Sequence, residues 1–265
     1  MLNAGFFKET IDSLHKSVYY LTFYFQGEPY LNPQFLEMVK YASLKKIYTA
    51  TSTNAHFLDE ENARRTVESG LDRLIISIDG TTQETYQSYR IGGSLEKVLE
   101  GTRNIIRWKR ELKSATPHVI FQFLVVKQNE HQTNEILELA KEYGVDEVRF
   151  KTAQVYDYKQ GNALIPMTDK FSRYKKETDG AYSIKNEMNN HCWRLWSSTV
   201  ITWDGLLVPC CFDKDAHHQM GDLKKTSFKE IWRNPAFSDF RSAVLRSRKE
   251  IDICANCSEG TKVWA

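Results

Sequence analysis

Short hydrophobic runs alternate with amphipathic segments through the first 153 residues. Runs rich in aromatic and β-branched residues predict strands at 18–25, 46–51, 73–78, 118–126 and 147–152. Helical spacing of apolar residues predicts helices at 6–15, 32–42, 60–69, 94–112 and 130–143. Strands alternating with helices at such short intervals predict parallel strands joined by crossover helices. The predicted α/β fold is either a partial parallel (β/α) barrel or a doubly wound sheet.

The pattern changes after residue 153. Residues 154–190 are polar and aromatic without sustained periodicity, so we interpret them as a connector. Residues 191–265 predict a small cysteine-containing domain, with a hairpin around Asp204-Gly205 and helices near 228–232 and 236–246.

Composition and charge exclude several classes of partner. The 265 residues are 41% hydrophobic and 26% charged, enough for a buried core. A net charge of +2 gives no field that favours nucleic acid or an anionic membrane surface. The longest apolar runs fall short of the roughly 20 residues of a membrane helix, and residues 1–10 do not resemble a secretory leader. We therefore expect a cytoplasmic, reduced protein.

All five cysteines follow residue 191, and clustered cysteines in a reducing compartment indicate metal or redox chemistry. Cys254 and Cys257 form a C-x-x-C pair, and Cys192 and Cys210 supply two more thiolates from the two ends of the predicted hairpin. The sequence predicts a metal site at these four residues. Cys211 is expected to be a small buried hydrophobic residue. Spacing alone is compatible with both structural zinc and a 4Fe-4S cluster.

Polar residues gather where the predicted strands end, and in both architectures this edge of the sheet binds ligands. Gly27, Glu28 and Pro29 offer a residue free to adopt positive φ, a carboxylate and a ring without an N–H. This turn suits an amino-bearing ligand, although an ordinary strand-to-helix turn has the same composition. The segment 52–54 follows the next strand in the same way.

Ser77 and Asp79 alternate with Ile76 and Ile78, so we expect the polar pair to face a barrel lumen if the isoleucines face the helices. Capping of the following helix is the alternative role of Asp79.

Four further polar positions have less specific surroundings in the sequence. Arg90 precedes two glycines, where its guanidinium could reach a ligand carboxylate or remain exposed. Gln122 is a polar residue within a buried strand. His217 and His218 could bind metal, but a solvated loop is the simpler interpretation.

Together these segments resemble the radical S-adenosylmethionine (radical SAM) superfamily, in the branch that ends in a SPASM or shorter twitch cysteine domain. Residues 23–33, FYFQGEPYLNP, resemble the loop that holds the methionyl amino group of the cofactor. Residues 52–54 resemble the family motif at the end of the next strand. Residues 77–80, followed by 89–93, resemble the segment that in the family contacts the ribose and the carboxylate of the cofactor. The resemblance implies cofactor contacts from Gly27, Glu28, Pro29, Ser52, Asn54, Ser77, Asp79, Arg90 and Gln122.

The C-terminal residues follow the auxiliary-cluster pattern in order, from Cys192 through Asp204-Gly205 and Cys210 to Cys254-x-x-Cys257. The resemblance therefore implies an auxiliary 4Fe-4S cluster rather than zinc. It also implies a peptide or small-molecule substrate and a reductant such as flavodoxin or ferredoxin.

One departure from the family pattern is large. The C-x-x-x-C-x-x-C loop of the primary cluster is absent, since no cysteine precedes Cys192. We therefore expect a barrel without its first strand and cluster loop, a radical SAM oxidoreductase or modifying enzyme as the parent, and no activity from this chain alone. The alternative is a non-catalytic accessory protein with a structural four-cysteine site.

Overall fold

The computed structural model describes residues 1–260 and divides the chain into two compact units. One unit comprises Asn3–Ala181, and the other comprises Met1–Leu2 together with the residues from Tyr182 onward.

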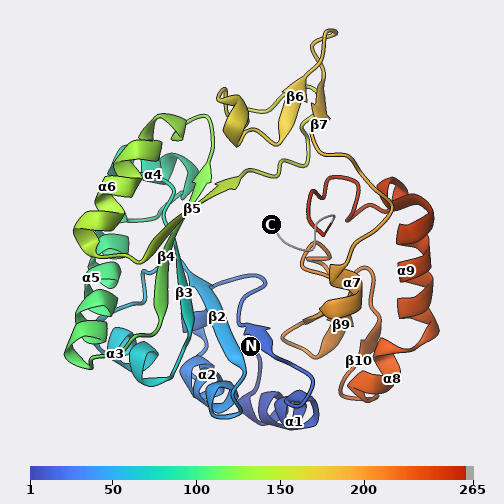
Figure 1. The fold of residues 1–265 in the computed structure, drawn as a ribbon, viewed down its shortest axis with the longest axis horizontal. Coiled ribbons are helices and arrows are strands. Elements are labelled where there is room, and N and C mark those ends of the chain that lie inside the picture. The colour runs from blue at the N-terminus through green and yellow to red at the C-terminus, as the bar shows by residue number, and fades with distance from the viewer. Residues whose placement is uncertain (261–265) are drawn as a thin grey trace. The chain divides into compact units, whose positions relative to one another are not determined.

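The first unit is built on five parallel strands in the order β1-β2-β3-β4-β5 (Figure 1). The strands are β1 (Tyr20–Thr22), β2 (Tyr48–Thr53), β3 (Arg73–Ser77), β4 (His118–Val125) and β5 (Glu147–Thr152). Strand order follows sequence order, so each crossover leads to the next strand along the sheet. The predicted parallel sheet of an α/β fold is confirmed.

Helices connect these strands and cover one face of the sheet (Figure 1). They are α1 (Ala4–Leu14), α2 (Phe35–Leu44), α3 (Glu60–Glu68), α4 (Gln83–Tyr89), α5 (Leu95–Glu111) and α6 (Thr133–Tyr143), with short 3₁₀ turns η1 (Pro29–Leu31) and η2 (Glu130–Gln132). Capping side chains and a glycine fix the ends of several of these helices. Asp59 and Ser94 cap the N-termini of α3 and α5, and Gly144 ends α6 in the left-handed conformation.

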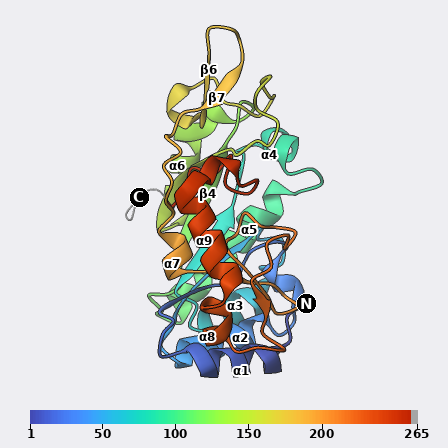
Figure 2. The same cartoon turned by 90° about the vertical axis from the view of Figure 1, so that its right-hand side faces the viewer.

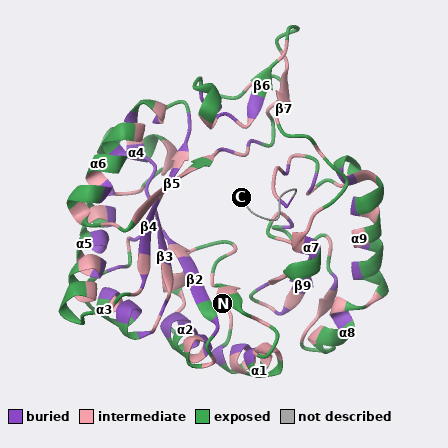
Figure 3. Ribbon diagram, in the orientation of Figure 1, coloured by how far each residue is buried: buried purple, intermediate pink, exposed green. Residues whose placement is uncertain are grey.

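The two faces of the sheet differ in chemistry because side chains alternate along each strand. The apolar side chains of one face pack against the helices, and buried residues concentrate on β2, β3 and β4 (Figure 3). This core includes Leu74, Ile76, Ile78, Val119, Phe121, Phe123 and Val125. The predicted orientation of Ile76 and Ile78 toward the helices is therefore confirmed.

The opposite, inner face carries polar and aromatic side chains. Tyr20 stacks on Tyr48 with ring centroids 5.3 Å apart, and the guanidinium of Arg73 lies 5.6 Å from the Tyr48 ring. Arg149 on β5 interacts electrostatically with Tyr20 and Tyr48, on β1 and β2.

Several element bounds differ from the sequence prediction. The strand predicted at 18–25 is limited to Tyr20–Thr22, and the helix predicted at 32–42 begins at Phe35 after the separate turn η1. Helix α4 was not predicted because only Tyr86 among its residues is buried, so it has no apolar period to detect. Thr82 caps this helix.

The segment predicted as a connector contains η3 (Asp169–Phe171), β6 (Tyr174–Lys176) and β7 (Tyr182–Ile184). The second unit continues with α7 (Arg194–Ser197), β8 (Val200–Ile201), β9 (Leu206–Val208), β10 (Gly221–Asp222), α8 (Phe228–Trp232), α9 (Pro235–Ser247) and η4 (Arg248–Glu250). Strands β8 and β9 pair antiparallel across Asp204-Gly205, as predicted.

Helix α9 is the longest of the second unit (Figures 1 and 2). Its buried Phe237, Phe240 and Val244 pack with Leu195, Leu207 and Ile231 into a core separate from that of the sheet unit. Within residues 1–260, no helix is both long and apolar enough to cross a bilayer.

Candidate functional site

The Gly27-Glu28-Pro29 loop lies just beyond the C-terminal end of β1 and is tied to the end of β2. Gly27 has φ of +78°, a conformation that glycine adopts without steric cost. The Glu28 carboxylate accepts hydrogen bonds from Thr53 Oγ1 at 2.8 Å and from the Asn54 backbone N–H at 2.8 Å. It also accepts a hydrogen bond from the Tyr30 backbone N–H at 3.3 Å. These contacts fix the direction of the carboxylate while leaving it half-buried.

Ser52, Ser77 and Gln122 belong to the inner face near the same edge. Ser52 Oγ and Ser77 Oγ are 3.4 Å apart, and Ser77 is the register partner of Gln122 across β3 and β4. The structure thus brings three predicted polar positions onto neighbouring strands. Their hydroxyl and amide groups offer both donors and acceptors, which suits a polyhydroxylated ligand.

Asp79 follows β3 and forms an ion pair with Arg90. Arg90 Nε lies 2.5 Å from Asp79 Oδ2, and the Leu124 backbone N–H donates to Asp79 Oδ1 at 2.8 Å. Asp79 is only 1% exposed, whereas a third of the Arg90 side chain reaches solvent. Thr82 rather than Asp79 caps α4, so the capping alternative is wrong. Arg90 is only partly exposed, because it is paired with Asp79. The pair holds the guanidinium at the carboxyl edge of the sheet.

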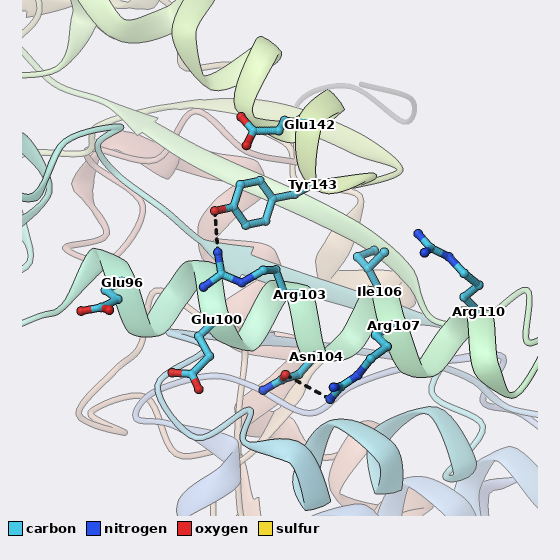
Figure 4. A pocket seen from close by; sticks show the side chains of 9 residues that line it. All are labelled: Glu96, Glu100, Arg103, Asn104, Ile106, Arg107, Arg110, Glu142 and Tyr143. Atoms are coloured by element: carbon cyan, nitrogen blue, oxygen red, sulfur yellow. Dashed lines mark hydrogen bonds between the residues drawn. The ribbon is translucent and has the colours of Figure 1, made fainter.

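A broad hollow lies elsewhere on this unit, along the outer surfaces of α5 and α6 (Figure 4). Arginine and glutamate side chains line it, and Arg103 donates to the Tyr143 hydroxyl at 2.9 Å. None of the predicted site residues lines this hollow, so we do not assign it to the site.

The four predicted ligand cysteines gather in the second unit. Cys254 and Cys257 are buried in the turns after η4, and Cys210 lies just after β9. Cys192 precedes α7 and lies against Gly260, whose φ is +74°. Electrostatic interactions link Cys254 to Cys192 and Cys257, and Cys210 to Cys254 and Cys257. Residues more than 60 positions apart therefore converge.

The chemistry of these thiols fits a bound metal group. Burial raises the pKa of Cys210 and of Cys254 to about 12, and it also raises the pKa of Cys257. Thiols with such high pKa values stay protonated at neutral pH unless a metal displaces the proton. The Glu259 backbone N–H donates to Cys257 Sγ at 3.3 Å, as expected around a metal-bound sulfur. Residues 1–260 contain no group of three histidine, cysteine or acidic side chains arranged to hold a single metal ion.

Two neighbouring predictions need correction or refinement. Cys211 is exposed rather than a buried hydrophobic residue, because it lies in the turn that follows β9. His217 and His218 donate their backbone N–H groups to the buried carboxylate of Asp213, and His218 Nε2 lies 2.7 Å from Asp252 Oδ1. These contacts serve the fold of this loop.

The two halves of the chain each match a known family. Residues 4–140, more than half of the sequence, match the family described as "Radical SAM superfamily". The chain belongs to the radical SAM superfamily. Residues 192–258 match the SPASM family, described as an iron-sulfur cluster-binding domain. S-adenosylmethionine and 4Fe-4S clusters are the cofactors of this family, so the predicted family and cofactors are confirmed.

Individual relatives agree with this assignment. The chain is 22% identical over 262 residues to the tungsten-containing aldehyde ferredoxin oxidoreductase cofactor-modifying protein of Pyrococcus furiosus, covering 88% of this chain and 71% of that protein. It is 23% identical to the PqqA peptide cyclase of Gluconobacter oxydans, covering 90% and 69%. The crystal structure of Streptococcus suis SuiB bound to precursor peptide SuiA shares the fold, with a TM-score of 0.66 at 12% identity, covering 90% and 60%.

Three residues at these radical SAM and SPASM sites were not found from the sequence. Thr53 is buried and holds Glu28, and Asn129 is buried and donates to the Asp79 carbonyl at 2.9 Å. Arg248 is buried beside the C-x-x-C pair. Thr53 lies within a quoted motif and could have been chosen, whereas nothing in the local pattern around Asn129 or Arg248 marks either residue.

Proposed function

We propose that this chain binds S-adenosylmethionine at the carboxyl edge of its parallel sheet, and that it contributes this site to a radical SAM reaction on a peptide substrate whose primary cluster its own residues do not supply. The observation that carries the proposal is the constrained carboxylate of Glu28, held by Thr53 and Asn54 with lone pairs still available. A fixed carboxylate at this edge suits the α-amino group of the cofactor.

The remaining edge residues complement the other parts of that ligand. Ser52, Ser77 and Gln122 offer hydrogen bonds to ribose hydroxyls, and Arg90 offers a charged donor to the cofactor carboxylate. Asp79 already occupies the Nε of Arg90, which leaves the terminal guanidinium nitrogens for the ligand. A peptide substrate is favoured because PqqA peptide cyclase and the SuiA-bound SuiB are among the relatives.

Glu28→Gln tests the cofactor site directly. Loss of the charge should weaken S-adenosylmethionine binding by about tenfold to a hundredfold, since a hydrogen bond to a charged group contributes about 1.5–3 kcal/mol. Isothermal titration calorimetry with the purified chain would measure the dissociation constant. Glu142→Gln, on the outer surface of α6, should leave it unchanged.

Unchanged affinity in Glu28→Gln, with wild-type thermal stability, would exclude this carboxylate as the amino-group partner. A parallel loss in Glu142→Gln would indicate a general effect of removing negative charge rather than a contact.

We also propose that Cys192, Cys210, Cys254 and Cys257 bind the auxiliary 4Fe-4S cluster. When bound, this cluster supplies an electron-transfer centre or a substrate ligand. Anaerobic reconstitution with iron and sulfide should load one cluster per chain. Replacing any of the four residues by serine should lower the iron and sulfide content, whereas Cys211→Ser, at the exposed neighbour, should not.

The chain offers no thiolate for the primary cluster, since residues 1–191 contain no cysteine. We therefore propose that residues 1–265 bind the cofactor without cleaving it, and that a donor such as flavodoxin or ferredoxin reduces the auxiliary cluster. Formation of 5′-deoxyadenosine from S-adenosylmethionine by the reconstituted, reduced chain, measured by mass spectrometry, would contradict the first of these statements.

A further inference from the structure

Arg248 is a buried cation that connects the separate segments of the cysteine site. It is 1% exposed at the start of η4. Its Nη1 donates to the His191 carbonyl at 2.9 Å, and its Nη2 donates to the carbonyls of Glu259 at 2.6 Å and Cys257 at 3.3 Å. The guanidinium therefore bonds backbone next to Cys192 and backbone at Cys257.

These hydrogen bonds do not neutralise its charge. Among residues 1–260 no carboxylate forms an ion pair with Arg248, and its Nε has no hydrogen-bond partner. Carbonyl oxygens contribute dipoles but no net charge. Since an isolated buried charge is strongly disfavoured, a buried arginine needs an anion or aromatic faces nearby.

Two other arginines of this unit, Arg194 and Arg241, are stabilised in different ways. Arg194 lies 2.9 Å from the carboxylate of Glu259 and is substantially exposed. Arg241 also donates to two backbone carbonyls and has no carboxylate partner, but its guanidinium lies 4.4 Å from the Trp232 ring and 4.6 Å from the Phe237 ring. The aromatic faces stabilise that cation.

The Arg248 guanidinium lies against the C-x-x-C pair: its Nη2 donates to the Cys257 carbonyl at 3.3 Å, and Cys254 and Cys257 are both buried. Its positive charge interacts electrostatically with both cysteine side chains. When these cysteines are thiolates bound to a cluster, they supply the anion that the guanidinium otherwise lacks.

We propose that Arg248 is the counter-charge of the auxiliary cluster and raises its reduction potential. This rests on the proposed ligation of the cluster by the four cysteines. Four thiolates outweigh the positive charge of the iron-sulfide core, and reduction adds another negative charge. A buried cation therefore stabilises the reduced state more than the oxidised state.

Three substitutions of Arg248 distinguish the effect of its positive charge from the effect of its hydrogen bonds to backbone carbonyls. Arg248→Lys keeps the charge with fewer donors, Arg248→Gln keeps an amide donor without charge, and Arg248→Met keeps only the apolar stem. Arg241→Gln is the matched control, since it also removes an arginine that bonds two carbonyls in this unit. Each full-length variant would be reconstituted anaerobically, assayed for iron and sulfide, and titrated potentiometrically with EPR detection of the reduced cluster.

We expect the Gln and Met variants to have a lower midpoint potential than the wild type, with Arg248→Lys and Arg241→Gln close to the wild type. If the neutral variants fail to retain a cluster, retention in Arg248→Lys and Arg241→Gln likewise supports a charge requirement. A wild-type potential in a fully loaded neutral variant would overturn the proposal. So would loss of the cluster in all three Arg248 variants with retention in Arg241→Gln, because tethering alone would then explain the residue.

The wild-type chain tests the proposed cluster site separately. If it takes up no iron-sulfur cluster, the assignment of the four cysteines fails, and the counter-charge role fails with it. If it takes up a cluster and the potentials do not depend on the charge at position 248, only the role of Arg248 fails.

Discussion

Gly260 lies against the side chain of Cys192, and its backbone carbonyl accepts a hydrogen bond from the Trp193 N–H at 3.1 Å. Its φ of +74° is unfavourable for any residue with a Cβ. A Cβ at this position would also collide with Cys192 Sγ. At the scale of single residues, this glycine therefore sets the position of one predicted cluster ligand.

Gly260→Ala should lower the iron and sulfide content after reconstitution, because the added methyl group displaces Cys192 Sγ. Gly180→Ala is the matched control: Gly180 also has positive φ, but a Cβ there meets no atom within 4 Å. Both variants carry a backbone cost of about 1 kcal/mol. Equal cluster content in the two variants would show that Gly260 does not set the position of Cys192.

The sequence was informative for residues whose chemistry lies within a short motif. Glu28 and the cysteine pair at 254 and 257 could be chosen because adjacent residues define their role. Arg248 could not, since its significance comes from carbonyls at His191 and Glu259 and from the absence of a carboxylate partner within residues 1–260. Only the folded chain brings these groups together.

At the scale of elements, β4 and β5 are joined on the inner face by charged side chains. Glu147 accepts hydrogen bonds from Arg149 Nε at 2.5 Å and Arg149 Nη2 at 3.0 Å, and His118 Nε2 lies 3.1 Å from the same carboxylate. The hydrogen bonds from Arg149, followed by that from His118, hold the pKa of Glu147 below its ordinary value of 4.5.

A lowered carboxylate pKa contributes stability that is present above about pH 4.5 and is lost as the pH falls through the folded-state pKa. The free energy of unfolding of the wild type should therefore fall more than that of Glu147→Gln between pH 6 and pH 3. Urea unfolding followed by circular dichroism across that range would measure the difference. Glu138→Gln, on the exposed side of α6, should retain the wild-type dependence on pH.

Strands and helices with a strong apolar period were predicted well. The bounds of β5 agree with the prediction, α3 ends one residue earlier than predicted, and α5 is one residue shorter at each end. Helix α4 and the turn η1 escaped detection because hydrogen-bonded caps at Thr82 and Glu28, rather than a buried stripe, define them.

At the scale of the whole molecule, the two units have separate apolar cores, and the predicted cluster belongs to only one of them. A ligand stabilises the folded unit that binds it. Within residues 1–260, four of the five tryptophans follow residue 190, whereas Trp108 belongs to α5 of the sheet unit. Tryptophan fluorescence therefore reports mainly on the cysteine unit.

Removal of the cluster by an iron chelator should lower the thermal midpoint seen by tryptophan fluorescence more than that seen by far-ultraviolet circular dichroism. The second signal comes largely from the helices of the sheet unit. Equal shifts of both midpoints would show that the units unfold as one cooperative structure.

The bonded carboxylate of Glu28 has a consequence for the thermodynamics of ligand binding. A free glutamate side chain loses about 1.5–2 kcal/mol of rotamer freedom when it is immobilised. Here Thr53 and Asn54 impose that ordering during folding, before any ligand arrives. An amino group that binds this carboxylate therefore meets a pre-ordered partner, and little conformational entropy of Glu28 is lost on association.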